Sequence, residues 1–440
     1  MTKHPRSGCP LRQPLLIFQT LKFHSDMLLG QVSWFDILVF AVFLTWRLLR
    51  DVGIYGTVIC AVRALPFLCR LTQAGSKQMR KKGSENLISI LGWRMPIDIT
   101  KERYLTKQNR QSAFTRRSTV FQALVVACMR YGFTCMPTRI GRVFFTKGVA
   151  LPFLRFRMFR HGYIWHLRHR PLWREINLNK GAVKGIWIVE DGARKPDVVI
   201  YYCHGGGFAM GTCYFYLEFL VSWVSILKKS GFSNPAIFAV EYTLIPDKTY
   251  PVQLQEIISG YNHVLSITGD PGKVVVSGDS AGGALILSLL LHVGNKCPQK
   301  KPSFAALISP WTHIVSKLNR DTPSDFLSVS RLHEYGRLYA GSEKLWNPMV
   351  SPGFCMDISW WRKAMPVRGV HFYFGSEEIF YESIKALAKR LSGVGSVVCR
   401  EEENLHAWPF AALFLGAHQK ERGRGLRRIS IDIAATLLHT

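Results

Sequence analysis

A serine held between glycines is the first feature of the sequence that points to chemistry. Ser280 lies in the segment Gly-Asp-Ser-Ala-Gly-Gly at residues 278–283, after the run Lys273–Ser277 and before an apolar helical stretch. A strand, a tight turn and a helix in this order are the setting of the G-x-S-x-G nucleophile elbow, which exposes a serine hydroxyl at the edge of a sheet. Gly278 and Gly282 suit this turn because it leaves no room for side chains. The segment predicts Ser280 as a nucleophile, although the pentapeptide alone also occurs in ordinary loops.

A second glycine-rich segment could supply the electrostatic half of such a site. His204-Gly205-Gly206-Gly207-Phe208 directly follows the apolar run Asp197–Cys203. Glycines let backbone N–H groups approach a developing oxyanion without intervening Cβ atoms, and each such donor can stabilise a transition state by about 3 to 4 kcal/mol. We assign the N–H groups of Gly206, Gly207 and Ala281 as these donors. A phosphate-binding loop fails as an alternative, because the pattern lacks both G-x-G-x-x-G spacing and a following Lys-Ser/Thr. Structural roles in the two loops are expected of His204, Gly205, Gly278 and Gly282.

The two segments together resemble a known family. HGGGF followed by GDSAGG is similar to the hormone-sensitive-lipase branch of the α/β hydrolases, and the resemblance covers roughly residues 184–421. The intervening segment Glu241–Asp247 resembles the family's Asp-Tyr-Arg-Leu-Ala-Pro-Glu, with substitutions at four positions. Within this branch, the apolar N-terminal part and residues 184–188 look most like fungal steryl acetyl hydrolase-type enzymes and the esterases of fungal secondary metabolism. The resemblance implies a serine carboxylic-ester hydrolase, similar to a deacetylase, that acts on an apolar acylated small molecule such as a sterol or a secondary metabolite.

A serine nucleophile of this fold needs an acid and then a histidine further along the chain. His406 follows the run Ser396–Arg400, where the fold has its last-strand loop histidine, and we predict it as the general base; the alternative is a histidine that merely begins a helix. The segment after the run Val370–Phe374 resembles the family segment that carries the acid, and this likeness places the acid at Glu378. The adjacent Glu377 is its rival, and the family more often has Asp here.

From about residue 184 onward, short apolar runs alternate with stretches of helical periodicity. This alternation is typical of βαβ units in a largely parallel sheet. The runs predicted as strands are Lys184–Val189, Asp197–Cys203, Ala236–Tyr242, Lys273–Ser277, Phe304–Ile308, Val370–Phe374 and Ser396–Arg400. The predicted crossover helices are Phe215–Lys229, Pro251–Ile267, Ala281–His292, Ile379–Leu391 and Ala407–Glu421. The expected fold class is α/β: an α/β-hydrolase with a mostly parallel sheet flanked by helices and a helical cap.

Two parts of the chain do not follow this alternation and are candidates for the cap. Residues 311–368 carry Trp346, Trp360 and Trp361 together with several prolines, and are expected to form an insertion above the sheet. Residues 100–170, which are basic and contain apolar helical segments, would supply the rest of that lid or a link to a membrane. The three tryptophans could line an apolar acyl or sterol pocket, although aromatic residues in a lid more often only pack.

Charge is distributed very unevenly along the 440 residues. The net charge is +28, and residues 1–180 hold 30 Lys/Arg against 7 Asp/Glu, so the later part is nearly neutral. No nucleic-acid-binding motif accompanies this basic region, and nucleic acid is therefore not the expected partner. The expected organisation is a polar and basic segment at 1–30, an apolar membrane-associated segment at 31–72, a basic helical cap or linker at 73–183, the catalytic domain at 184–421 with its insertion at about 311–368, and a basic tail at 422–440.

The segment at residues 31–72 contains two apolar runs, Ile37–Trp46 and Val52–Val62, separated by charged residues. Neither run reaches the roughly 20 residues of a spanning helix. A tilted membrane helix, an interfacial or re-entrant pair and a soluble amphipathic pair all fit this pattern. We expect membrane association of some kind, on an intracellular membrane such as the endoplasmic reticulum, because the basic residues that follow suit an anionic cytoplasmic leaflet.

The ten cysteines include no CxxC pair and form no Cys/His cluster with zinc-ligand spacing. Neither a disulfide framework nor a metal site is expected, and a reducing compartment is the simplest interpretation. The predicted chemistry needs no organic cofactor either. Two other functions stay open at this point: amide hydrolysis or acyl transfer by the same three residues, and a non-catalytic binding protein with the same fold, which loss of the histidine would have favoured. No pattern in the sequence specifies an oligomeric state.

Overall fold

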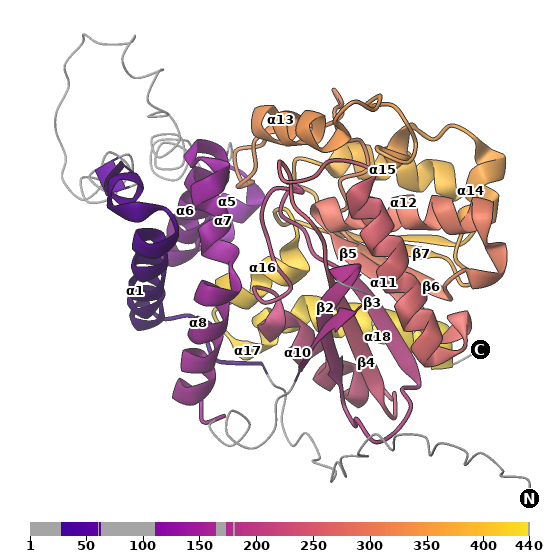
Figure 1. Cartoon of the computed structure of the whole chain (residues 1–440), viewed down its shortest axis with the longest axis horizontal. Helices are drawn as coiled ribbons and strands as arrows, with labels where there is room; N and C mark the ends of the chain where they lie inside the picture. Colours follow the sequence, from indigo (N-terminus) through magenta and orange to yellow (C-terminus); the bar gives the residue numbers. More distant parts are fainter. Residues whose placement is uncertain (1–27, 60, 63–110, 164–172, 179–180, 439–440) are drawn as a thin grey trace, which may run out of the picture.

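An eight-stranded, mostly parallel sheet forms the centre of the molecule (Figure 1). The computed structural model describes residues 28–59, 61–62, 111–163, 173–178 and 181–438. The strands lie in the order β1-β2-β4-β3-β5-β6-β7-β8. β2 pairs antiparallel with both β1 and β4, and the remaining pairs are parallel. The α/β class with a mostly parallel sheet, predicted from the alternation of apolar runs and helical stretches, is confirmed.

Buried apolar runs form most of the strands, and each of the predicted strands is present with bounds shifted by at most a few residues. The strands are β1 (Arg174–Leu178), β2 (Val183–Val189), β3 (Val198–Cys203), β4 (Pro235–Glu241), β5 (Val274–Asp279), β6 (Phe304–Ile308), β7 (Val370–Gly375) and β8 (Val397–Glu402). β3 is buried along its whole length, as expected of a parallel strand covered on both faces. β1 is not among the predicted strands, because its largely polar sequence REINL lies exposed at the edge of the sheet.

Helices cover both faces of the sheet and enclose two apolar cores (Figure 1). The helices of this part are α10 (Leu217–Lys229), α11 (Val252–Thr268), α12 (Ser280–Lys296), α13 (Val329–Ala340), α14 (Ile358–Ala364), α15 (Tyr381–Leu391), α16 (Trp408–Leu415), α17 (Gln419–Arg422) and α18 (Arg424–Leu438), with 3-10 turns η4 (Pro271–Lys273), η5 (Pro298–Lys300) and η6 (Pro352–Phe354). Residues of α11, α12 and α15 pack in one core and residues of α10 and α18 in the other. Because successive side chains of a strand point to opposite faces, Tyr201 lies in the first core and Tyr202 in the second. The helix predicted at Ala407–Glu421 is divided into α16 and α17, since α16 ends at Gly416.

The segment at residues 422–440, expected as a basic tail, instead contains a helix that covers the sheet. Leu426, Ile429 and Ile433 of α18 are fully buried and pack in the same core as α10. Their i, i+3, i+7 spacing gives the helix one apolar face, although the three arginines near its start make the segment look like a basic tail. The packed hydrolase part therefore continues to Leu438 and does not end at residue 421.

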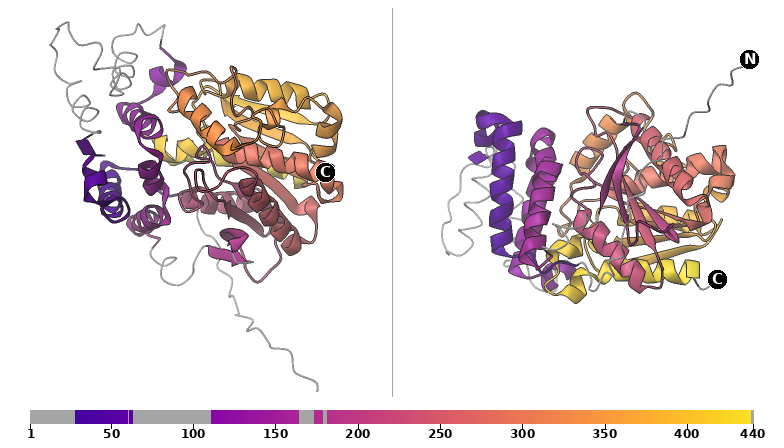
Figure 2. Two further views of the ribbon diagram at one scale, coloured as in Figure 1. Left: turned by 45° about the horizontal axis from the view of Figure 1, so that its top comes forward. Right: turned by 60° about the horizontal axis from the view of Figure 1, so that its bottom comes forward.

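Five helices of the described residues precede the sheet and lie together over one side of the hydrolase part (Figures 1 and 2). They are α1 (Trp34–Asp51), α5 (Ala113–Arg117), α6 (Val120–Cys135), α7 (Thr138–Phe145) and α8 (Lys147–Arg160). α1 packs on α7 and α8 and is the outermost layer. The lid expected at residues 100–170 thus corresponds to α5, α6, α7 and α8, which we call the cap together with α1. Residues 1–27, 63–110 and 164–172, part of the predicted N-terminal segments, lie outside the described residues.

The insertion expected above the sheet at residues 311–368 covers it only in part. α13 contacts the cap, since the Arg331 guanidinium donates to the Met136 carbonyl at 3.0 Å, whereas α14 packs along α12 at the flank of the sheet. Trp360 donates its indole N–H to a carbonyl of α12 at 2.8 Å, Trp361 is buried beside it, and Trp346 is exposed. These tryptophans therefore pack or face solvent, and none of them lines the cavity described below.

The expected apolar segment at residues 31–72 is described as far as residue 62. It forms α1, followed by helical residues at 53–59 and 61–62. Across the part of the chain that the structure describes, no helix is both long enough and apolar enough to cross a membrane.

Replacing Leu426 by Ala should lower the free energy of unfolding by about 2 to 5 kcal/mol, because removing a fully buried leucine leaves a cavity between α18 and the sheet. Leu438→Ala on the same helix is the control. Because Leu438 is 42% exposed, this substitution should change the free energy of unfolding by less than about 0.5 kcal/mol. Urea unfolding followed by circular dichroism measures both variants. Equal effects would contradict the packing of α18 described above.

Candidate active site

Ser280 lies at a sharp turn between β5 and α12. β5 ends at Asp279 and α12 begins at Ser280, whose φ of +51° lies in the left-handed region that a non-glycine residue rarely adopts. The backbone around it is closely packed, because a Cβ on Gly278 would lie 2.8 Å from the Gly282 carbonyl oxygen, and a Cβ on Gly282 would collide with the Cys203 carbonyl. This is the geometry of a nucleophile elbow, at the carboxyl edge of the sheet.

The carboxylate of Asp279 is buried beside the serine and connects it to the glycine loop. Its Oδ1 accepts hydrogen bonds from the Tyr202 hydroxyl at 2.7 Å and from the Gly205 N–H at 2.8 Å, and its Oδ2 accepts one from the Tyr216 hydroxyl at 2.8 Å. Burial raises the pKa of this carboxyl, and the two tyrosine hydroxyls oppose the rise by stabilising the charged form. With these partners, Asp279 holds the two loops at a fixed distance.

The glycine loop after β3 lies over Ser280. Gly206 and Gly207 have φ values of +113° and +63°, which glycine adopts without strain, and both line the same cavity as Ser280. Ala281 is in the first turn of α12, where backbone N–H groups are free of intrahelical partners and carry partial positive charge. The geometry suits the three N–H groups predicted as oxyanion donors, and that role stays a prediction.

His204 packs against the glycine loop and holds it in place. Its buried ring stacks on Tyr242 with centroids 4.4 Å apart, and its Nδ1 lies 2.8 Å from the Gly205 carbonyl oxygen. The Tyr242 hydroxyl also donates to the His204 carbonyl at 2.9 Å. The structural role expected of His204 agrees with these contacts.

The structure brings His406 and Glu378 together. Their Nδ1 and Oε1 atoms are 3.7 Å apart, and neither atom has a hydrogen-bond partner elsewhere among the described residues. Glu378 is fixed from its other side, because Oε2 accepts from the Ser309 hydroxyl at 2.5 Å and from the Gly375 N–H at 2.8 Å. The separation of 3.7 Å is longer than a hydrogen bond, and catalytic contacts of this kind commonly shorten when a substrate binds.

Glu377, the rival for the acid, faces the cap. Its Oε1 accepts from the Phe114 N–H at the start of α5, at 2.9 Å, and its Oε2 accepts from the Ser324 hydroxyl. Both carboxylate oxygens therefore have partners away from His406. The geometry favours Glu378 as the acid.

Two opposing effects act on the pKa of His406. Burial lowers it, but the adjacent carboxylate of Glu378 and the charges of Asp325 and Asp279 raise it, and the net change is upward from the usual 6.5. Asp325 is itself buried, accepts from the Ile379 N–H at 2.8 Å, and has a pKa raised by burial. His406 is thus placed among carboxylates that stabilise its protonated form.

Ser309 is a site residue that the sequence analysis does not single out. It follows β6 directly, with a φ of +42°, and joins the acid to the histidine loop: its hydroxyl donates to Glu378, and it accepts from the Ala407 N–H at 2.9 Å. The one sequence feature that could have indicated Ser309 is its position directly after a predicted parallel strand, because such residues lie at the same edge of the sheet as Ser280.

A stack of aromatic rings runs from the glycine loop to the histidine. Phe208, at the end of the glycine loop, stacks on Tyr339 at 3.8 Å and on Trp311 at 5.5 Å between ring centroids. Trp311 stacks on Phe380 at 5.7 Å, and Phe380 meets the His406 ring edge to face at 5.1 Å. This stack connects the glycine loop to His406 through packed rings.

Ser280 and His406 open into a cavity of about 440 Å³ that lies between the hydrolase part and the cap. This volume is in the range of small-molecule sites. The lining side chains come from α1, α6, α7, α8, α16 and the regions 205–218 and 326–335, and most are apolar. Among the described residues, no group of three His, Cys, Asp or Glu side chains could hold a metal ion.

Comparison with known families shows the family of the chain. A family model described as steryl acetyl hydrolase matches residues 174–408, which is more than half of the chain. The chain belongs to the steryl acetyl hydrolase family. The family resemblance inferred from HGGGF and GDSAGG is thereby confirmed, and the matched residues include Ser280, Glu378 and His406.

Individual members of the steryl acetyl hydrolase family match a part of the chain. Steryl acetyl hydrolase 1 of Saccharomyces cerevisiae is 26% identical over 212 residues, covering 44% of this chain and 48% of that protein, and a relative from Schizosaccharomyces pombe is 28% identical over 227 residues, covering 48% and 59%. The chain thus spans about half the length of these curated relatives. A hormone-sensitive lipase from a metagenome library aligns over 73% of this chain and 99% of its own with a TM-score of 0.54 and 20% identity, which shows the α/β-hydrolase fold.

Activity should decrease toward acid with a midpoint above pH 6.5. The predicted base must be neutral to accept a proton, and the carboxylates around His406 raise its pKa, so activity is lost as the pH falls through that raised pKa. Glu378→Gln should shift this midpoint to lower pH and reduce kcat by up to about 10⁴-fold. The pH dependence of kcat/KM measures the midpoint. Glu377→Gln is the matched control and should leave the midpoint unchanged. If the midpoint shifts in Glu377→Gln and not in Glu378→Gln, Glu377 is the acid.

Ser309→Ala should lower kcat by about tenfold with little change in KM, because Glu378 loses a hydrogen bond that orients it toward His406. It should also move the acid midpoint, which a purely structural role would leave in place. Ser303→Ala is the control: this buried serine precedes the same strand and donates to the Val274 carbonyl at 2.8 Å. If both variants behave alike, Ser309 has no positioning role.

Proposed function

We propose that the protein is a serine carboxylic-ester hydrolase that removes a short acyl group from an apolar small molecule. One observation carries the proposal: Ser280, the glycine loop and His406 line a single cavity, and Glu378 lies behind His406. Membership of the steryl acetyl hydrolase family and the order serine, acid, histidine along the chain support it.

In the first half of the proposed reaction, His406 takes the proton of the Ser280 hydroxyl while this oxygen bonds to the ester carbonyl carbon. The negative charge on the carbonyl oxygen is held by the N–H groups of Gly206, Gly207 and Ala281. The bond to the alcohol oxygen then breaks, and His406 returns the proton to the departing alcohol. Ser280 is left carrying the acyl group as an ester.

In the second half, a water molecule gives a proton to His406 while its oxygen bonds to the acyl carbon. Breakage of the bond to Ser280 releases the carboxylic acid, and the serine oxygen recovers the proton from His406. Glu378 stays ionised throughout and stabilises the imidazolium.

An apolar substrate, such as an acylated sterol or secondary metabolite, is part of the proposal. The lining of the cavity supports an apolar substrate, because apolar side chains, among them Phe133, Phe145 and Phe215, far outnumber polar side chains there. A cavity of about 440 Å³ gives an apolar ligand of this class room against the cap.

A membrane-associated, intracellular location is the remaining part. The large apolar side chains exposed along α1 support contact with a membrane surface. Every cysteine of the described residues is free, which supports a reducing compartment.

A fluorophosphonate probe should label the wild-type protein and fail to label Ser280→Ala, because the reagent bonds to an activated serine oxygen. Hydrolysis of p-nitrophenyl acetate should be lost in the same variant. Ser288→Ala is the matched control: this buried serine lies further along α12, where it donates to the Ala284 carbonyl at 3.1 Å, and the variant should label as the wild type does.

Two outcomes would contradict the proposal. If folded wild-type protein, verified by circular dichroism, does not label or labels equally in Ser280→Ala, the serine mechanism is wrong. If labelling follows Ser280 but an added amine takes the acyl group faster than water does, the protein is an acyltransferase instead.

A further inference from the structure

Helix α1 turns its apolar residues outward and its buried carboxylate inward. The outward residues are Trp34, Phe35, Leu38, Val42, Trp46 and Leu49, with exposed fractions from 40% to 68%, and we call these six the α1 stripe. Ile54 and Tyr55 in the following helical residues are exposed as well. Between residues 31 and 49 no charged side chain is exposed, since Asp36 is buried and Arg47 is turned partly away from solvent and paired with Asp51. A helix that faced water on this side would show the opposite pattern.

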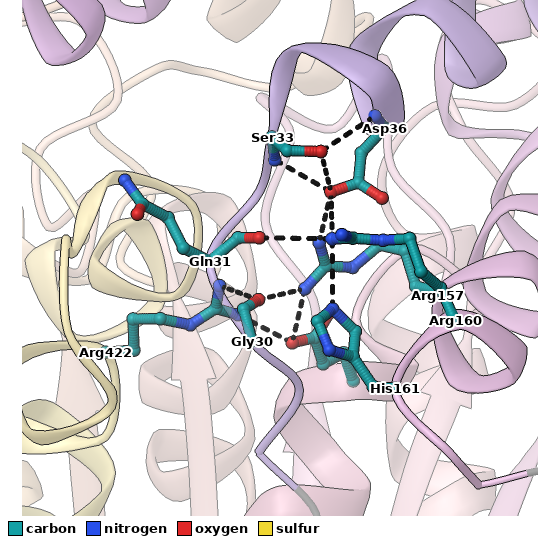
Figure 3. A network of polar contacts seen from close by, with 9 residues as sticks. Gly30, Gln31, Ser33, Asp36, Arg157, Arg160, His161 and Arg422 are labelled. Carbon is teal, nitrogen blue, oxygen red and sulfur yellow. Dashed lines mark hydrogen bonds and ion pairs between the residues drawn. The ribbon is translucent and has the colours of Figure 1, made fainter.

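A network of charged groups fixes this rotation of α1 (Figure 3). Asp36 Oδ2 lies 2.5 Å from the Arg160 guanidinium and 3.3 Å from that of Arg157. The Gly30 carbonyl, just before α1, accepts from Arg157 at 2.7 Å and from Arg422 of the hydrolase part. A buried carboxylate without partners would lower the stability of the fold, so Asp36 must face these arginines. The stripe on the opposite side of the helix must then face outward.

The active-site cavity reaches the α1 stripe. Ile37, Phe40 and Trp34 of α1 line it, together with residues of α6 that include Phe121. Of all the lining residues, each of which the structure describes, only Trp34 and Cys128 are exposed. The lining residues that reach solvent thus lie on α1 and α6, and the cavity opens between these helices, beside the packed rings of Trp34 and Phe121, which meet at 5.3 Å and 90°. We call this opening the mouth.

We propose that the α1 stripe lies in the surface of a lipid bilayer, and that the ester passes sideways from the bilayer through the mouth to Ser280. The inference rests on the proposed ester hydrolase function and adds a docking surface and a route. Tryptophans near both ends of the stripe, Trp34 and Trp46, suit the interface between headgroups and acyl chains, and the exposed Arg50 at its end suits anionic headgroups.

The position of the mouth favours lipid over a second protein as the occupant. Trp34 belongs both to the α1 stripe and to the wall of the cavity, so a protein packed on the stripe would close the opening. A bilayer would cover the same side chains and still let an apolar solute reach the cavity. An acylated sterol partitions into the bilayer, where its local concentration is far higher than in water.

The double variant Leu38→Glu/Val42→Glu tests the docking surface, because these stripe residues do not line the cavity. Vesicles of phosphatidylcholine and phosphatidylserine that carry cholesteryl acetate serve as the membrane, and flotation measures binding. We expect vesicle binding and cholesteryl acetate hydrolysis to fall at least about tenfold, with p-nitrophenyl acetate hydrolysis unchanged. Leu338→Glu/Val367→Glu is the control, since these residues are 43% and 71% exposed but lie outside the cap, and it should behave as the wild type does.

Phe121→Glu tests the mouth separately, because Phe121 lines the opening and is not part of the α1 stripe. Vesicle binding should equal that of the wild type. The rate with cholesteryl acetate in vesicles should fall about tenfold relative to the rate with p-nitrophenyl acetate, because a carboxylate now lies in the path of the apolar ester. Val120→Glu changes the neighbouring, exposed residue that does not line the cavity, and should leave this ratio unchanged.

The outcomes separate the two levels of the proposal. If the wild type hydrolyses neither ester, the proposed function is wrong. If it hydrolyses p-nitrophenyl acetate and the stripe variant binds vesicles as the wild type does, the docking surface is wrong while the function stands. If Phe121→Glu leaves the ratio of the cholesteryl acetate rate to the p-nitrophenyl acetate rate unchanged, the ester does not enter through the mouth. If the wild type sediments as a dimer and the stripe variant as a monomer, the stripe is an interface between two copies, and the bilayer inference is overturned.

Discussion

The geometry of the site depends on the buried carboxylate of Asp279. It directly precedes Ser280, the proposed nucleophile, and its oxygens accept from the Gly205 N–H and from the hydroxyls of Tyr202 and Tyr216. β3 and β5 are neighbours in the sheet, so one side chain spans the two loops that carry the serine and the glycine N–H groups. Because a buried carboxylate that loses a partner is strongly destabilised, the spacing of these loops is held firmly, and the unfavourable φ of Ser280 is tolerated.

The parts of the site that could be predicted are those encoded in short stretches of sequence. The glycines around Ser280 and after His204 are required by the local backbone, and buried strands are visible as apolar runs. Ser309 escapes such reasoning, because its role comes from contacts to Glu378 and Ala407, which are distant along the chain. Two elements were concealed in other ways: the polar edge strand β1 forms no apolar run, and the basic residues of α18 hide its apolar face.

Several arginines of the described N-terminal helices attach the cap to the hydrolase part. The Arg142 guanidinium donates to the Ala209 carbonyl beside the glycine loop at 2.9 Å, and Arg130 donates to the Asp325 carbonyl at 2.7 Å. Arg157 is almost wholly buried against Asp36, and burial lowers the pKa of Arg422 in the same network to about 10. Guanidinium groups satisfy several carbonyls at once, which suits them to join helices to loops. For these helices, a count of charges alone therefore overstates how many basic groups face solvent.

The adjacent carboxylates Glu377 and Glu378 connect the cap to the chemistry. Glu377 accepts from the Phe114 N–H of α5, while Glu378 faces His406 on the other side of the same short loop. The two residues are adjacent in the chain, so a movement of α5 that displaces the backbone at Glu377 would also displace Glu378, the proposed acid. Glu378 is held by the Ser309 hydroxyl and the Gly375 N–H. A shift of the cap that moves this loop would therefore change the distance between the carboxylate of Glu378 and the ring of His406. The contacts that hold the cap and those that hold Glu378 beside His406 thus lie in one short loop.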